Sequence, residues 1–284
     1  MEGSNPIWIP KTIAHSGNIR KINLDGTFFE GRLTGDEVRA KISINYIIEH
    51  IFQNTGVRLK SVDILRLKLG HTNIVKKLTK EDINKYFQPN ERGVNVSKQK
   101  MDALVMPLNE ADSFSHLMAI GTADCAPIII RSNKLVGIAH SGHKGLADGI
   151  IKNLADATHA IESSDRNLRI AIAPMAEKLL FPLSFEDKIP SDFYNLYRDL
   201  GFIQTLKPGN KLRGQIFDND PSSEDKLYFN IISIIIHQLL KEFKISESSI
   251  ELSNIDTTKD SNSYSYRRDK NDPDYSNNYS YSGV

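Results

Sequence analysis

Residues 116–161 read HLMAIGTADCAPIIIRSNKLVGIAHSGHKGLADGIIKNLADATHAI, and this stretch decides the fold class of the chain. HLMAIG, IIIR and LVGIAH are short apolar runs separated by the TADCAP and SNK turns, so they predict three buried strands. From residue 143 onward the stretch predicts a helix, because apolar side chains recur at spacings of three and four: Leu146, Ile150, Leu154, Ala157 and Ile161. Buried strands followed by a helix with one apolar face are typical of an α/β fold.

The remainder of the chain continues this alternation of strands and helices. Residues 34–56 predict a helix, because Thr34 and Glu37 have the spacing of a capping box. Further strands are predicted at residues 61–70, 168–174 and 245–256, and further helices at 191–202 and 226–243. We therefore expect residues 1–284 to form a single α/β domain.

Charged side chains crowd into residues 76–100, which read KKLTKEDINKYFQPNERGVNVSKQK. This segment predicts a short helix and a solvated loop, because apolar residues are sparse and do not recur at a regular period. We expect it to form a charged excursion from the domain.

The composition excludes several classes of partner. The 36 basic side chains nearly cancel the 35 acidic ones, so the overall charge favours neither a nucleic-acid polymer nor a membrane surface. No stretch approaches the roughly 20 apolar residues of a membrane span. The start, MEGSNPIWIPKT, lacks the pattern of a secretory signal. Since a single cysteine forms no disulfide within the chain, we expect a reducing, cytoplasmic compartment.

Three side chains that bind transition metals stand where predicted strands end. Cys125 is the only cysteine of the chain, and His71 and His140 also lie where a strand gives way to a loop. Two imidazoles and one thiolate are a ligand set for a catalytic zinc ion, with a fourth position left for water or substrate. Such an ion lowers the pKa of a bound water from about 16 toward roughly 7. The spacing of the three residues fits no compact zinc finger, and an inert core cysteine with two hydrogen-bonded histidines is the structural alternative.

Four blocks of the sequence, in order, resemble one known family. LKLGHTNIV, TADCAPIII, GIAHSGHKGLADGI and SYSYRRDK are similar to motifs of the family once called multicopper polyphenol oxidase or laccase-like, now viewed as zinc-dependent purine nucleoside enzymes. The resemblance runs from about Gly35 to the C-terminal tail. It implies a single α/β domain with mixed β-sheets flanked by helices, resembling the cysteine-hydrolase-like toxin fold.

The resemblance also implies a cofactor and a reaction. It places Zn²⁺ on His71, Cys125 and His140. It implies phosphorolysis of adenosine, inosine or related nucleosides to the base and ribose 1-phosphate, with adenosine deamination as a further activity. The expected partners are a purine nucleoside and phosphate, with no nucleic-acid polymer and no membrane.

Charge suggests roles for five neighbouring residues. Lys144, Arg267 and Arg268 would neutralise phosphate, although a disordered tail is the alternative for the two arginines. Asp124 would orient a ligand or carry a proton, and His143 would act as an acid or base near neutral pH. Support of the ligands by hydrogen bonding is the alternative for both.

The chain departs from the family pattern at several positions. His143 and Lys144 stand where the family often has tryptophan and arginine, and residues 171–178 read AIAPMAEK in place of a glycine-proline-x-isoleucine-glycine loop. A lysine is a point charge and lacks the planar two-point contact that arginine makes with phosphate. We therefore expect a pocket that differs from the family pattern.

Three other functions are consistent with the same residues. A metal-free cysteine hydrolase or amidase would use Cys125 as the nucleophile and His140 as its base. A family member without turnover would retain the fold and the metal. A copper oxidase is disfavoured, because multicopper sites need about ten histidines and the chain has 8.

Overall fold

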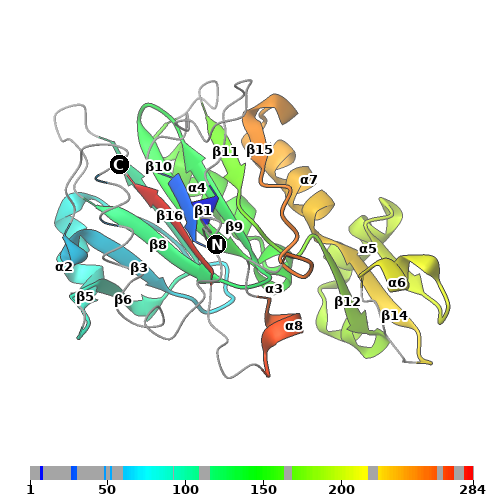
Figure 1. Ribbon diagram of the computed structural model, residues 1–284. Coiled ribbons are helices and arrows are strands. Elements are labelled where there is room, and N and C mark those ends of the chain that lie inside the picture. The colour runs from blue at the N-terminus through cyan, green and yellow to red at the C-terminus, as the bar shows by residue number, and fades with distance from the viewer. Residues whose placement is uncertain are drawn as a thin grey trace, which may run out of the picture.

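Two large β-sheets pack face to face and form the centre of the molecule (Figure 1). The structure is a computed structural model, and it describes residues 7–8, 27–30, 48, 52, 60–91, 93–108, 116–162, 168–216, 223–260, 265–271 and 278–283. Both sheets contain parallel and antiparallel pairs. The fold is therefore a mixed α/β fold, as the sequence predicted.

The first sheet has six strands in the order β15-β11-β9-β10-β7-β4. The strands are β4 (Val75–Lys77), β7 (Ala103–Pro107), β9 (Ala126–Arg131), β10 (Leu135–Ser141), β11 (Arg169–Ile172) and β15 (Ile250–Leu252). Every residue of β10 is buried, because this strand is central in the sheet and both of its faces are covered.

The second sheet has seven strands in the order β1-β2-β16-β8-β3-β6-β5. The strands are β1 (Ile7–Trp8), β2 (Thr27–Glu30), β3 (Ile64–Lys68), β5 (Phe87–Pro89), β6 (Asn95–Lys100), β8 (Leu117–Thr122) and β16 (Asn278–Gly283). Leu65 and Leu67 of β3 belong to the core between the two sheets. Side chains alternate along a strand, so Arg66 and Lys68 lie on the other face of β3.

Helices cover the face of the six-stranded sheet that is turned away from the second sheet. α4 (Ile150–His159) and α7 (Ile231–Phe243) pack there with their apolar sides inward. The short α3 (His143–Ala147) connects β10 to α4. No helix among the described residues is long and apolar enough to cross a membrane.

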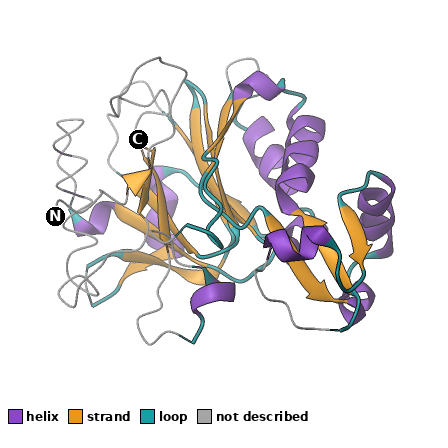
Figure 2. Ribbon diagram, turned by 45° about the vertical axis from the view of Figure 1, so that its right-hand side comes forward, coloured by secondary structure: helices purple, strands orange, loops and turns teal. Residues whose placement is uncertain are grey.

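A third, three-stranded sheet lies to one side of this core (Figure 2). It consists of β12 (Lys178–Pro182), β14 (Lys226–Asn230) and β13 (Ile203–Leu206), with α5 (Ser191–Asp199) and α6 (Lys211–Ile216) beside it. The other short helices are η2 (Ser61–Asp63), η3 (Lys80–Asp82), α2 (Ile83–Tyr86), η5 (Leu183–Lys188), η6 (Glu247–Ser249) and α8 (Tyr266–Asp269).

The structure confirms most of the predicted elements and corrects three. The helix expected from residue 143 onward is divided into α3 and α4 at Gly149, whose φ of 87° is left-handed. The helix predicted at 226–243 begins only at Ile231, because the preceding five residues pair as β14. The side chain of Asn230 accepts a hydrogen bond from Ser233 N and starts the helix there.

The prediction of a solvated loop within residues 76–100 is wrong. This segment does contain the short helix α2, but it also supplies most of β4 and all of β5 and β6, and thus joins both large sheets. Lys98 and Lys100 of β6 are exposed, while Ser97 and Leu78 are buried. Nearly all of the helix predicted at 34–56 lies outside the described residues.

The C-terminal tail is part of the second sheet rather than disordered throughout. β16 pairs antiparallel with β8 on one side and with β2 on the other. α8 precedes it and carries both arginines of the SYSYRRDK block.

Candidate metal centre

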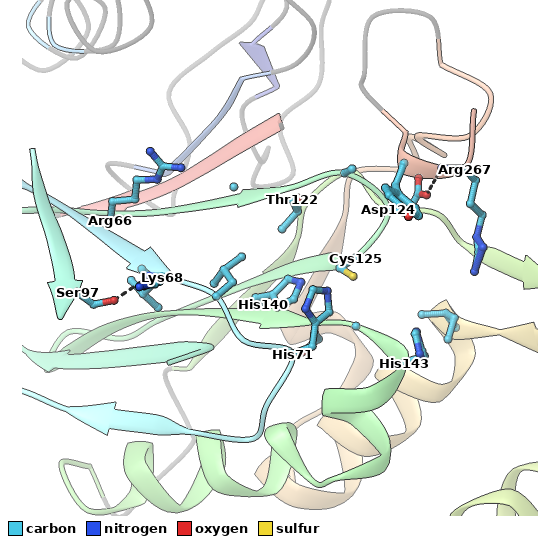
Figure 3. Close-up of a pocket in the computed structure, with 18 of the residues that line it drawn as sticks. Arg66, Lys68, His71, Ser97, Thr122, Asp124, Cys125, His140, His143 and Arg267 are labelled. Carbon is cyan, nitrogen blue, oxygen red and sulfur yellow. Dashed lines mark hydrogen bonds between the residues drawn. The ribbon is translucent and has the colours of Figure 1, made fainter. Parts of the chain in front are cut away.

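His71, Cys125 and His140 converge at one end of the two packed sheets (Figure 3). Their candidate ligand atoms, two imidazole nitrogens and one sulfur, all lie within 4.8 Å of one another. The two imidazole rings meet edge to face, with their centroids 4.8 Å apart. The structure thus brings together the three residues that the sequence analysis selected as metal ligands.

Strand pairing explains this convergence. β9 and β10 are antiparallel neighbours, and their register places His140 opposite Pro127 and Ser141 opposite Ala126. Cys125 immediately precedes β9, so its side chain lies beside the end of β10. His71 comes from the other sheet, in the loop after β3. The site therefore forms where the two sheets meet, and ligands distant in sequence become neighbours.

Asp102 joins the loop of His71 to His140. This buried carboxylate accepts hydrogen bonds from the backbone N–H groups of Gly70 (3.2 Å), His71 (3.0 Å) and Thr72 (2.8 Å). It also lies 2.8 Å from His140 Nδ1. The φ of 54° at His71 is left-handed, and three successive N–H groups directed at one carboxylate stabilise that conformation.

Sequence analysis missed Asp102. It precedes the apolar run ALVMP directly, and a carboxylate at the start of a buried strand was the available signal. Burial by itself raises the pKa of Asp102, but hydrogen bonds from His140 and Thr72 hold it well below its usual range. The ionised carboxylate binds His140 Nδ1–H and leaves Nε2 of that ring for a metal.

The charge state of Cys125 fits metal binding. Burial raises the pKa of its thiol, but the charge of His140 and hydrogen bonds from both imidazoles lower it to about 6. For His140, burial lowers the pKa, whereas Cys125 and Asp102 raise it to about 9. A metal that binds here displaces a proton from His140, and the resulting thiolate and two neutral imidazoles are a donor set that suits Zn²⁺ and leaves one position open.

Gly142 is required by the close packing of the site. A Cβ atom at this position would lie 2.8 Å from Cys125 Sγ and 3.6 Å from His71 Cδ2. Any larger residue would therefore push the sulfur out of its present position.

The three candidate ligands face a cavity of about 980 Å³. An aromatic wall stands beside them, in which the ring of Phe181 stacks on Phe185 at 4.2 Å between centroids. The ring of His143, the first residue of α3, meets the same two rings edge to face at 5.0 and 5.2 Å. Burial and the nearby positive charge of Arg267 lower the pKa of His143 to about 4. His143 is therefore neutral at pH 7.

Asp124 and Arg267 also line the cavity. The carboxylate of Asp124 accepts hydrogen bonds from the backbone N–H of Arg267 (2.9 Å) and from Thr257 Oγ1 (3.1 Å), and so anchors α8. The guanidinium of Arg267 lies 4.8 Å from the centroid of the Phe181 ring. Its Nε is buried, and within the described part of the chain it has no hydrogen-bond partner.

Lys144 and Arg268 do not line the cavity. Lys144 is 60% exposed, and its Nζ lies 2.6 Å from Asp148 Oδ2. The guanidinium of Arg268 donates to the carboxylate of Asp269 and to the carbonyl oxygens of Thr257 and Asp260. Arg268 thus holds the tail in place, and only one of the paired arginines reaches the site.

Residues 36–274 match the protein family described as multi-copper polyphenol oxidoreductase laccase. The chain is 30% identical over 97 residues to purine nucleoside phosphorylase RP494 of Rickettsia prowazekii and 37% identical over 60 residues to purine nucleoside phosphorylase RC0672 of Rickettsia conorii. These alignments span 38% and 24% of the two relatives and 32% and 20% of this chain.

Solved structures share the fold over nearly the whole chain. The hypothetical protein YfiH of Bacillus licheniformis superposes with a TM-score of 0.64 at 19% identity, covering 90% of this chain and 91% of that one. YlmD of Geobacillus stearothermophilus superposes with a TM-score of 0.58 at 18% identity, covering 90% of each chain. At these identities the likeness establishes the fold alone.

Proposed function

The chain belongs to the multi-copper polyphenol oxidoreductase laccase family, and on that premise we propose that it is a zinc-dependent purine nucleoside phosphorylase. The observation that carries this proposal is the convergence of His71, Cys125 and His140 at a single cavity. The names of the two rickettsial relatives support the choice of nucleoside and phosphate as substrates.

The donor set favours one zinc ion over a cluster of coppers. Among the described residues, one group of histidine, cysteine and acidic side chains has the geometry to hold a metal. The whole chain contains 8 histidines, fewer than the roughly ten that three copper centres need. A bound Zn²⁺ would supply a positive charge that polarises the substrate.

The chain's own side chains would position the two substrates. Phe181 and the neutral ring of His143 line the cavity and offer apolar surface against which a purine base can pack, while Phe185 supports Phe181 by stacking on it. The guanidinium of Arg267 lies beside that wall and lines the cavity, which suits contact with a phosphate oxygen. His143 would accept or donate a hydrogen bond as a neutral ring, and Asp124 would position Arg267 through the backbone of α8.

A metal-free cysteine hydrolase is a second candidate. The low pKa of Cys125 and the high pKa of His140 make a thiolate–imidazolium pair, which is the charge state of an activated cysteine nucleophile. In such a hydrolase, Cys125 and His140 would act without a metal ion.

The deciding experiment measures metal content and products together. Purified protein and the Cys125→Ala variant are analysed for metal, then incubated with adenosine in the presence and absence of phosphate, and the products are separated by chromatography. We expect stoichiometric zinc in the wild type alone, with adenine and ribose 1-phosphate formed only when phosphate is present. Inosine without phosphate would instead indicate deamination.

Two results would contradict the proposal. Activity that survives chelators but is abolished by iodoacetamide would indicate the cysteine hydrolase. Bound zinc with no turnover across a panel of nucleosides would indicate a binding protein.

We place the protein in the cytoplasm, with residues 1–284 as one domain, and we retain the likeness to cysteine-hydrolase-like toxin domains as a prediction. Superposition on such a domain would test the last point.

A further inference from the structure

The cavity is larger than a nucleoside and a phosphate ion require. Small-molecule sites range from about 300 to 1,000 Å³, and this cavity of about 980 Å³ is at the upper end. It extends past the candidate metal ligands along β3 and β6, where Arg66, Lys68 and Lys98 line it. Figure 3 shows Arg66 and Lys68 on one side of the three ligands and Arg267 on the other.

The cavity lining is strongly positive. Four of its side chains are basic, namely Arg66, Lys68, Lys98 and Arg267, and one is acidic, Asp124, among the lining residues that the structure describes. That single carboxylate already accepts two hydrogen bonds. The chain as a whole has a formal charge of only +1, so the positive charge of the cavity is a local concentration.

An irregularity of the sheet shapes this end of the cavity. β3 and β6 run parallel, and their register shifts between Arg66 and Lys68. Ser97 fixes the shift, because its buried hydroxyl accepts the backbone N–H of Lys68 at 2.8 Å and donates to the carbonyl of Gln99 at 2.9 Å. Irregularities of this kind redirect side chains and recur beside binding sites.

Lys98 is positioned by a contact of its own. Its Nζ donates a hydrogen bond to the carbonyl oxygen of Asn84 at 2.8 Å, which leaves its two other protons available to a ligand. Lys68 and Lys98 are both exposed, and both line the cavity.

We propose that Arg66, Lys68 and Lys98 form a second anion subsite, which binds a phosphate group on the opposite side of the metal ligands from Arg267. This inference rests on the proposed function for the nucleoside part of the ligand. A phosphate there has two possible sources: inorganic phosphate, or the 5′-phosphate of a nucleotide that reaches across the metal centre. Lysine and arginine bind phosphate through charge-assisted hydrogen bonds in either case.

Equilibrium binding tests the subsite without relying on turnover. Isothermal titration calorimetry is carried out on the zinc-loaded full chain with adenosine, adenosine 5′-monophosphate and inorganic phosphate as separate probes. The variants are Arg66→Gln/Lys68→Gln and, as a matched control, Lys77→Gln, an exposed lysine of β4 that does not line the cavity. Circular dichroism melting checks that each variant is folded.

We expect the wild type to bind adenosine 5′-monophosphate about tenfold more tightly than adenosine, as one hydrogen bond between charged groups provides. The double variant should lose that preference while retaining its affinity for adenosine, and Lys77→Gln should keep it. If the affinity for inorganic phosphate falls instead, the subsite takes the free ion.

Unchanged affinity of the double variant for both phosphate probes would overturn the inference. Because adenosine binding is measured alone, an absence of phosphorolysis would count against the proposed function and leave the subsite standing.

Discussion

The wall of the cavity that carries His71, Cys125 and His140 and the wall formed by α8 are held in place by different means. The first is built from adjoining strands and from Asp102, a carboxylate with no exposed surface. The second is a four-residue helix in which Tyr266 is 57% exposed and Arg267 is anchored through its backbone to Asp124.

The difference separates two properties of the site. A wall held together by a buried, multiply hydrogen-bonded carboxylate fixes the geometry that a metal requires before any ligand arrives. A wall joined by a few polar contacts can vary in sequence without disturbing the core. We therefore expect substitutions in the first wall to change metal affinity and stability, and substitution of Arg267, the arginine of the second wall that lines the cavity, to change the affinity for substrate.

The largest effect is expected for Asp102→Asn. The amide keeps the shape of the carboxylate but loses its charge, so it no longer holds His140 and the loop of His71 in one arrangement. Zinc affinity should fall about 100-fold, the upper end for partners of metal ligands. Competition with a chromophoric chelator measures this.

The matched control for that substitution is Asp148→Asn, which removes an acid that pairs with Lys144 outside the cavity. Equal zinc affinity in wild type and Asp102→Asn would show that Asp102 does not organise the ligands.

The next largest effect is expected for Gly142→Ala. The added methyl group would lie 2.8 Å from Cys125 Sγ, so the sulfur must move. Overpacking of this kind costs about 2 kcal/mol, which corresponds to roughly a 30-fold loss of zinc affinity. The same chelator competition reports it, with Lys144→Ala as a nearby control. If the variant bound zinc as tightly as the wild type, the sulfur of Cys125 would be able to move without loss of the site.

In the second wall, the paired arginines should behave differently from each other. Arg267→Ala should raise KM for phosphate about tenfold, the smaller value for a hydrogen bond to a charged group, and leave the zinc content unchanged. Arg268→Ala should instead lower the melting temperature, because Arg268 ties Thr257, Asp260 and Asp269 together. Steady-state kinetics and thermal melting are measured for both variants. If the two variants behaved identically, the assignment of Arg267 to phosphate binding and of Arg268 to stability would be wrong.

The last prediction concerns the pH dependence of stability. His143 has a pKa of about 4 in the folded chain against 6.5 for the unfolded reference. Between these values the unfolded state binds more protons, so the contribution of His143 is complete above pH 6.5 and is lost as the pH falls toward 4. Urea denaturation of wild type and His143→Gln across this range should show a shallower pH dependence in the variant. Parallel curves would exclude His143 as a source of acid sensitivity.

Sequence patterns singled out the candidate metal ligands because Cys125, His71 and His140 each stand at the end of a predicted strand with a clear apolar pattern. Asp102 was missed because a single carboxylate among 35 acidic residues has no periodicity to mark it. Its role depends on which backbone N–H groups surround it, and these come from a loop about thirty residues earlier.

The sequence also does not show in which direction a charged side chain points. Lys144 and Arg268 carry the charge that phosphate needs, yet each is paired with a neighbouring carboxylate, Asp148 and Asp269.

Residues 226–230 were assigned to the helix that follows, because short apolar runs do not distinguish a strand from a helix. The charged segment 76–100 hid three strands, because exposed lysines such as Lys98 and Lys100 of β6 interrupt the apolar pattern that marks a buried strand.

The placement of β16 has a consequence for biosynthesis. In the described part of the second sheet, β2 adjoins β1 and β16, and β16 in turn adjoins β8. Residues 27–30 emerge early from the ribosome, but their bridge to the rest of the sheet is residues 278–283. A nascent chain can assemble the hairpin of β9 and β10 long before that bridge exists. The N-terminal strands must then wait, unpaired with the sheet, until translation reaches the tail.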